Sequence, residues 1–201
     1  MNARIARRFK AIVTCKACSL HRNQCPLVDK LLAPRADVCW VGLSAKARLQ
    51  ADARPLSEET RSGAIIGEIE SLFPSLVFYR TNLVKCPPMQ NDRLRYPTTK
   101  EMTSCSPNVF LELKITRPQI VILLGRQVID FFMGMSGLTA PVFDEAFSYQ
   151  PQTSGIFSAP LLGVHHPSFV NVYRRKRLGE YTNGVARAIE DICKVAPTLS
   201  N

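Results

Sequence analysis

The sequence has no run of apolar residues long enough to span a bilayer, which takes about 20 residues, so we expect no membrane-spanning helix. Residues 1–13 are basic and amphipathic, and they lack the long apolar stretch and small-residue cleavage site of a secretory signal peptide. Both absences favour a cytoplasmic protein.

Acidic residues are scarce relative to basic ones. The 201 residues include 16 Asp and Glu against 26 Lys and Arg, which gives a net charge of +10. Such a charge favours a polyanionic partner, because binding phosphates releases their counterions. The composition leaves two alternatives open, a basic surface that only confers solubility and one that binds anionic membranes.

The seven cysteines do not indicate a disulfide framework, because their number is odd and the expected compartment is reducing. Cys15 and Cys18 form a CxxC pair, and Cys86 and Cys105 flank residues 87–98. Four thiolates suit either zinc or an iron–sulfur cluster, and their spacing does not separate the two. Four unligated buried cysteines are the plain alternative. We expect the other three to be small buried or incidental residues, namely Cys25, Cys39 and Cys193.

Apolar runs and helical patterns alternate along the chain. The runs at 38–43, 77–84, 119–125 and 160–165 are short and apolar on both faces, which is typical of parallel strands covered by helices. Helical periodicity predicts helices at 61–73, 99–115, 126–133 and 178–195, and loops at 87–98 and 134–158. The pattern indicates one α/β domain over residues 1–201. Ligands of such sheets bind at the carboxyl ends of the strands.

Several motifs occur in an order that resembles a known family. They are Cys15-x-x-Cys18-Ser-Leu-x-Arg22, Arg61-Ser62-Gly63, the strand end Thr81-Asn82-Leu-Val-Lys85-Cys86-Pro-Pro88, Cys105, Pro118-Gln-Ile-Val-Ile-Leu-Leu-Gly125-Arg126 and His166-Pro167-Ser168. Together they resemble the uracil-DNA glycosylase superfamily, most closely its iron–sulfur branch, family 4. The resemblance implies a three-layer α/β/α sandwich with a central four-stranded parallel sheet. It also implies a [4Fe-4S] cluster held by Cys15, Cys18, Cys86 and Cys105.

By this resemblance, the base pocket lies at the strand ends and DNA is the partner. An enzyme of this kind must flip its target base out of the duplex. Asn82 would match the edge of a pyrimidine, since an amide both donates and accepts. His166 would stabilise the charge that develops on the leaving base. The pocket would also include Gly42, Leu43, Ser44 and Leu56.

The same resemblance implies a DNA-contacting surface. After His166, the loop with Phe169 and Val170 would enter the minor groove as an apolar wedge. The cations that follow would neutralise phosphates, and Ser62, Gly63, Lys85 and Ser168 would add contacts. The cations are Arg174, Arg175, Lys176 and Arg177.

The first motif departs from the family pattern. Family 4 has an acidic residue there that activates water, and Leu43 occupies its position; Leu56 replaces a stacking phenylalanine. Three explanations remain open. Another carboxylate could activate the water, namely Asp52, Glu58 or Glu59. Alternatively, stabilisation of the leaving base alone could suffice to break the glycosidic bond, or the protein could bind DNA without cutting it. The changed pocket favours a base larger than uracil.

The sequence thus predicts a monomeric DNA glycosylase that removes uracil or a modified pyrimidine, such as a modified cytosine, and leaves an abasic site. Its setting would be DNA repair or defence against modified DNA, with no small-molecule cofactor beyond the cluster. One alternative is a catalytically silent iron–sulfur module that recognises damaged or modified DNA. Another is an unrelated α/β protein with a zinc site that acts on a nucleotide.

Overall fold

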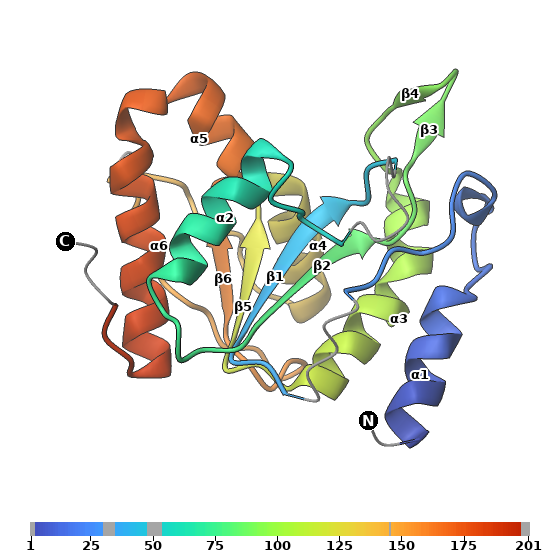
Figure 1. Ribbon diagram of the computed structural model, residues 1–201, viewed down its shortest axis with the longest axis horizontal. Coiled ribbons are helices and arrows are strands. Elements are labelled where there is room, and N and C mark those ends of the chain that lie inside the picture. Colours follow the sequence, from blue (N-terminus) through green and yellow to red (C-terminus); the bar gives the residue numbers. More distant parts are fainter. Residues whose placement is uncertain (1–2, 30–34, 48–53, 145, 198–201) are drawn as a thin grey trace.

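The computed structural model describes residues 3–29, 35–47, 54–144 and 146–197, and it has a central sheet between two layers of helices (Figure 1). The strands of the sheet are β1 (Val38–Ser44), β2 (Phe78–Val84), β5 (Ile120–Leu124) and β6 (Leu161–Val164). They are all parallel and lie in the order β2-β1-β5-β6. The expected three-layer α/β fold with a four-stranded parallel sheet is confirmed.

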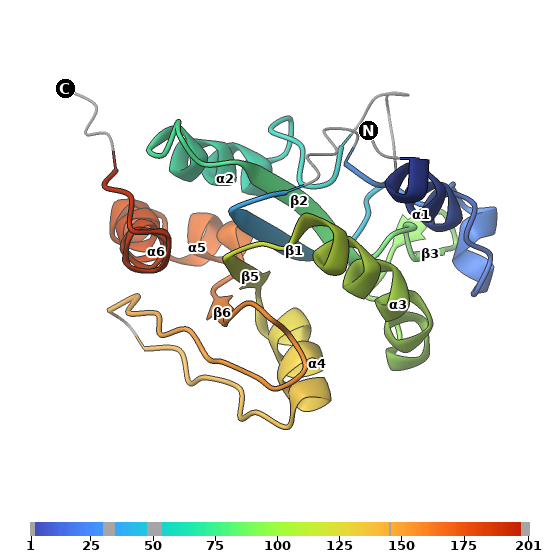
Figure 2. The same cartoon turned by 90° about the horizontal axis from the view of Figure 1, so that it is seen from below.

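Alternate residues of each strand face opposite helix layers, which is why the strands are apolar on both faces. In β1, Val38 and Trp40 belong to one core cluster, while Cys39 and Val41 belong to the other. The first layer contains α2 (Arg61–Ser71), α5 (Pro167–Tyr173) and α6 (Leu178–Cys193). The second contains α3 (Thr99–Thr116) and α4 (Arg126–Ser136), on the opposite side of the sheet in Figure 2.

The four predicted helices begin at the predicted residues, and their ends differ from the prediction by at most three residues. Local capping explains the starts. Thr98 and Glu101 form a capping box at α3, and the Thr60 hydroxyl accepts from the Gly63 N–H at α2. Helix α1 (Ala3–Val13) lies outside the sandwich and packs on α3, where Phe9 and Ile12 share a small core with Ile115.

The segment 87–98, which we predicted to be a loop, contains a hairpin of β3 (Met89–Gln90) and β4 (Arg93–Leu94). Its turn residues Asn91 and Asp92 have φ of 49° and 57°, as a two-residue hairpin turn requires. The hairpin projects from the edge of the sheet toward which the strands point (Figure 1). The described residues also include two short 3-10 helices, η1 (Ser19–Arg22) and η2 (Arg175–Arg177).

In the part of the chain that the structure describes, no helix has the length and apolar character needed to cross a membrane.

Candidate active site

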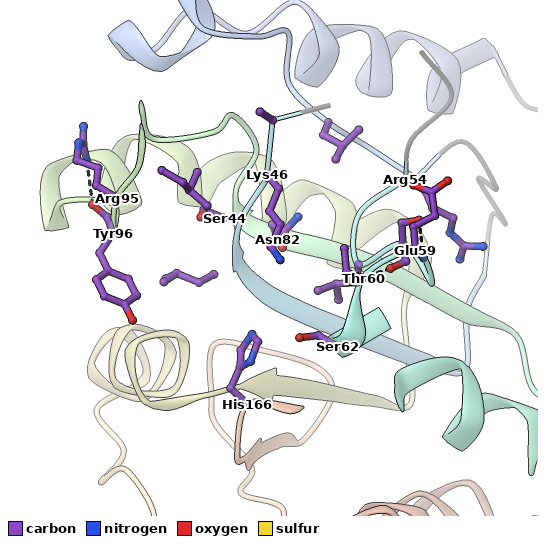
Figure 3. Close-up of a pocket in the computed structure, with 16 residues that line it drawn as sticks. Ser44, Lys46, Arg54, Glu59, Thr60, Ser62, Asn82, Arg95, Tyr96 and His166 are labelled. Atoms are coloured by element: carbon purple, nitrogen blue, oxygen red, sulfur yellow. Dashed lines mark hydrogen bonds between the residues drawn. The ribbon is translucent and has the colours of Figure 1, made fainter. Parts of the chain in front are cut away.

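The carboxyl ends of three strands surround a cavity of about 610 Å³. Strand β1 contributes Leu43 and Ser44, β2 contributes Asn82, and His166 follows β6 (Figure 3). Residues from the β1–α2 connection and from the hairpin complete the wall. The described lining residues beyond these four are Leu27, Lys46, Ala47, Arg54, Leu56, Ser57, Glu59, Thr60, Ser62, Leu94, Arg95 and Tyr96.

Asn82 in β2 is the register partner of Gly42 in β1, and its side chain lies close to the Gly42 Cα. A Cβ atom at Gly42 would come within 2.4 Å of the Asn82 Oδ1 and 2.9 Å of the Leu56 Cδ2. Only glycine therefore leaves room for both side chains. The structure brings together three of the predicted pocket residues, with the Asn82 amide 3% exposed at the base of the cavity.

Arg80, which the sequence analysis did not single out, holds the pocket wall. Its fully buried guanidinium donates to Glu70 at 2.9 and 2.6 Å, to Glu58 at 3.0 Å and to the Leu56 carbonyl at 2.9 Å. Leu56 has a φ of 52°, a left-handed conformation that a leucine adopts only when its surroundings enforce it. The available signal was an arginine inside a strand that is otherwise uncharged.

His166 carries a neutral imidazole. Burial, together with the positive charge of Lys46, lowers its pKa from 6.5 to about 4. The backbone N–H of Ser168 donates to the His166 Nδ1 at 3.2 Å, and the Ser168 hydroxyl lies 2.8 Å from the same nitrogen. Because Nδ1 accepts, the ring proton resides on Nε2. His166 therefore offers a hydrogen-bond donor to the cavity that it lines.

The other histidine of the pair has a packing role. His165 is 7% exposed, its Nδ1 lies 2.9 Å from the Tyr149 hydroxyl, and its ring stacks on Phe143 with centroids 4.1 Å apart. His165 therefore packs among aromatic rings, and His166 is the histidine of the pair that lines this cavity.

The carboxylates near the cavity are not equivalent. Glu58 forms an ion pair with Arg80, while Glu59 is exposed and lines the cavity. Asp52 lies outside the described residues. Leu43 is part of the cavity wall, so an apolar side chain stands at the strand end where the family has an acid. Among the described lining residues, Glu59 is the one carboxylate.

Lys85 does not contact DNA, contrary to our prediction. Its side chain is fully buried, and its ammonium group bonds to Glu112 and Thr81. Glu112 also accepts from the Thr81 hydroxyl at 2.7 Å and the Tyr79 hydroxyl at 3.0 Å. The buried carboxylate thus neutralises Lys85 inside the molecule, where phosphates cannot reach it.

Two further predicted DNA contacts are wrong. Val170 is a residue of α5 that is fully buried in the core, so it is not part of an exposed wedge; Phe169 beside it is 41% exposed. The Gly63 N–H is already taken by the Thr60 hydroxyl, and a Cβ there would lie 1.9 Å from the Ser57 carbonyl oxygen. Gly63 therefore serves the local packing of the loop against α2.

The basic cluster 174–177 is divided between solvent and internal contacts. Arg175 and Lys176 are exposed. Arg177 bonds to Glu180 at 2.7 Å and lies over the Phe147 ring at 5.0 Å. Arg174 lines a second cavity beside the first, together with Ser168. Ser62 is 8% exposed and lines the first cavity.

The four predicted cluster ligands, Cys15, Cys18, Cys86 and Cys105, belong to three segments that are distant in the sequence, and the fold brings these segments close together. Cys86 and Cys105 share a core cluster with Cys18 packed against it. The Asn108 amide lies 3.3 Å from the Cys15 Sγ and 3.8 Å from the Cys105 Sγ. Burial, followed by the charges of Cys105, Cys18 and Cys15, raises the pKa of the Cys86 thiol to about 12.

This donor set of four sulfurs fits an iron–sulfur cluster in its chemistry. Within the described ranges, no three His, Cys, Asp or Glu side chains are placed around a single metal ion. As for the remaining cysteines, Cys39 and Cys193 are buried, as expected, and Cys25 is exposed.

The sequence is similar to those of known proteins. Residues 26–192 match the uracil DNA glycosylase superfamily. The chain is 23% identical to a type-4 uracil-DNA glycosylase of Archaeoglobus fulgidus, over 94% of each sequence. It is 30% identical to a type-4 uracil-DNA glycosylase of Sulfurisphaera tokodaii, over 63% of this chain and 56% of that protein.

The fold is also similar to the crystal structure of wild-type Pedobacter heparinus SMUG2. The TM-score is 0.55 at 13% identity, and the match covers 80% of this chain and 77% of the other. The family match spans most of the sequence, including every strand of the sheet. The chain therefore belongs to the uracil DNA glycosylase superfamily and is a hydrolase of N-glycosyl bonds in DNA.

Proposed function

We propose that the protein flips a pyrimidine out of DNA into the 610 Å³ cavity and hydrolyses its N-glycosyl bond, leaving an abasic site. The base is uracil or a modified pyrimidine such as a modified cytosine. The observation that carries this proposal is the pairing of an amide, Asn82, with a neutral Nε2–H donor, His166, in one cavity at the strand ends.

Asn82 recognises the base and His166 assists bond cleavage. The amide presents one donor and one acceptor, which matches the polar edge of a pyrimidine. As the bond to the sugar breaks, negative charge develops on the base. The Nε2–H of His166 donates to the base oxygen that carries this charge, and such a donor contributes about 10²–10³ in rate.

Glu59 is our candidate for orienting the attacking water in place of the absent first-motif carboxylate. It lines the cavity, and no ion pair with another described residue holds its side chain in the wall, whereas Glu58 is paired with Arg80. An exchange of Glu59 for glutamine separates two routes. If Glu59→Gln lowers the rate of base release about as much as His166→Ala does, Glu59 activates the water. If the rate is unchanged, the bond breaks by leaving-group stabilisation alone.

The size of the cavity supports a substituted base. Sites of about 300–1,000 Å³ hold drug-sized ligands, so this one exceeds what an unsubstituted pyrimidine needs. Lys46, Arg54 and Glu59 line it together with Ser44 and Thr60, so a polar substituent on the base would find charged and hydroxyl partners.

We also propose that Cys15, Cys18, Cys86 and Cys105 hold a [4Fe-4S] cluster. The convergence of the four residues supports this proposal, because the Asn108 amide lies near the Sγ atoms of Cys15 and Cys105, and Cys18 packs against the core cluster that contains Cys86 and Cys105. The cluster would tie the N-terminal segment and the hairpin to the sheet. Ser62, Ser168, Phe169, Arg174, Arg175 and Lys176 are the remaining proposed DNA contacts.

The test is base release from oligonucleotides that contain uracil, hypoxanthine, hydroxymethylated cytosine or glucosylated cytosine, followed by alkaline cleavage at abasic sites. Release of a pyrimidine by the wild type and its loss in His166→Ala support the proposal. Tight DNA binding without release of any base would instead favour a silent module that only recognises modified DNA. Release of hypoxanthine alone would contradict pyrimidine recognition by Asn82.

A further inference from the structure

A second cavity, of about 900 Å³, lies beside the base cavity and shares part of its wall. Leu43, Tyr96 and His166 line both. The second cavity is lined by residues from the start of α4 and from α5. Both helices begin after the carboxyl ends of strands, at the edge toward which the strands of the sheet point (Figure 1). A DNA strand whose base enters the first cavity would therefore pass this opening.

The second cavity gathers the exposed aromatic side chains. In the described ranges, three aromatic residues are exposed, Tyr96 at 74%, Phe169 at 41% and Tyr173 at 75%, and all three line this cavity. The other described tyrosines, Tyr79, Tyr149 and Tyr181, are buried. Exposed rings gathered in one groove of a basic protein are typical of nucleobase stacking surfaces.

One wall of the cavity is a continuous column of rings. Phe143 and His165 stack with centroids 4.1 Å apart, and His165 and Phe169 stack with centroids 6.0 Å apart and planes at 17°. The Tyr173 ring continues the row, with its centroid 5.2 Å from that of Phe169 and its plane tilted by 43°. His165, at the buried end, is held by the Tyr149 hydroxyl. The column thus fixes the exposed rings in place before any ligand binds.

The opposite wall is fixed as well. The Arg95 guanidinium donates to the Tyr96 carbonyl at 2.9 Å and to both Glu101 oxygens at 2.8 and 2.6 Å. Glu101 in turn belongs to the capping box of α3. The backbone that carries the Tyr96 ring is therefore anchored to a long helix, although the ring itself is mostly exposed.

Cations line the same cavity. The Arg126 guanidinium lies 5.5 Å from the Phe143 ring centroid with about half of its side chain exposed, and Arg174 lies at the other end of the lining. Rings for stacking and cations for phosphates are the two features with which proteins bind single strands.

We propose that the second cavity is a nucleobase subsite for the nucleotide next to the extruded one, whose base stacks on the rings of Phe169 and Tyr173. This inference rests on the proposed function and adds a second base to the recognised substrate. Because two neighbouring bases must leave the helix together, the enzyme acts on single-stranded or locally melted DNA at least as fast as on a stable duplex.

The test is a double-mutant cycle between a protein ring and a DNA base. The substrate carries the target base with either a normal neighbour or a tetrahydrofuran abasic analogue, placed on the 5′ or the 3′ side. The enzymes are the wild type, Tyr173→Ala and Tyr173→Phe, with Ile156→Ala as an exposed control that lines a different cavity. Both Kd and single-turnover release are measured.

With a normal neighbour, Tyr173→Ala is expected to weaken binding about tenfold, while Tyr173→Phe and Ile156→Ala stay near wild type. With the analogue on the relevant side, Tyr173→Ala should add no further loss, because the stacked base is already absent. The subsite would be overturned if Tyr173→Ala lost the same binding affinity with a normal neighbour and with the analogue, on either side of the target base. It would also be overturned if Tyr173→Ala lost no affinity at all.

The same experiment separates the two proposals. A wild type that binds these oligonucleotides but releases no base contradicts the proposed function, and the cycle on Kd still tests the subsite. A wild type that releases the base normally, with no dependence on the neighbour, contradicts only the subsite. A wild type that requires a stable duplex would also contradict it.

Discussion

Exchange of Gly42 for alanine tests whether the position of the Asn82 amide governs catalysis. The added Cβ would lie 2.4 Å from the Asn82 Oδ1 and 2.9 Å from the Leu56 Cδ2, distances that Cβ atoms essentially never show. The backbone at Gly42 does not need a positive φ, so alanine is compatible with the strand itself. The conflict is confined to two side chains of the pocket.

Asn82 is the side chain that must give way. Strand pairing fixes the backbones of β1 and β2, and the Asn82 Oδ1 is the nearer of the two atoms that the new Cβ would meet. Rotation of the Asn82 amide relieves the contact and shifts the amide about 1 Å away from the base. A displacement of this size costs on the order of 10²-fold in rate. The overpacking itself costs about 1–3 kcal/mol, which leaves the protein folded.

The assay is single-turnover base release, together with thermal unfolding followed by circular dichroism. Gly179→Ala is the matched control, because Gly179 is exposed in α6 and its added Cβ would meet nothing within 4 Å. We expect Gly179→Ala to release base at the wild-type rate and Gly42→Ala to be about a hundredfold slower. A folded Gly42→Ala protein with a wild-type rate would refute the role of the amide position.

Four further predictions follow from buried groups. Glu112→Gln removes the charge that neutralises the buried Lys85, so we expect the free energy of unfolding to fall by about 3–5 kcal/mol. Urea denaturation measures this loss, and a loss below about 1 kcal/mol would contradict the pairing. Burial and Lys46 lower the pKa of His166 to about 4, so kcat/KM should stay level as pH falls through 6.5 and decline only near pH 4, and a decline centred at 6.5 would contradict this. The same shift means that the unfolded chain binds this proton first, so stability should decrease as pH falls from 6.5 toward 4. Cys86→Ser should lose the brown colour and iron content of the purified protein, whereas Cys193→Ser should keep both; equal iron in the two variants would contradict the proposed ligands.

The local pattern was sufficient for the sheet and for four helices, but helix α1 and the short helix α5, which includes the predicted loop with Phe169 and Val170, were not predicted. The four apolar runs became the four strands of the sheet, and the helices began at the predicted residues, because apolar periodicity and caps act over a few neighbouring residues. The hairpin after Cys86 was missed, since its strands have two residues each and bury little. Short, exposed strands leave almost no apolar pattern in a sequence.

Side-chain direction at the edge of the sheet was not predictable in the same way. Lys85 follows an apolar strand directly before a cysteine, and a basic residue near DNA is an ordinary phosphate ligand. Its partner Glu112 lies 27 positions further along the chain and meets it only when α3 packs on β2. The inward turn of Val170 and the outward turn of Phe169 likewise depend on how the short α5 packs.

The sequence by itself determined the α/β fold, the strand ends that carry Asn82 and His166, and the family, because these depend on local pattern and on motifs in order. Only the tertiary structure placed Tyr96 beside His166, 70 positions away, and joined the rings of α5 and the core into one column. It also directed Lys85 inward and Phe169 outward. These outcomes depend on which side chains from distant parts of the sequence pack against each other, and neither composition nor periodicity predicts such contacts.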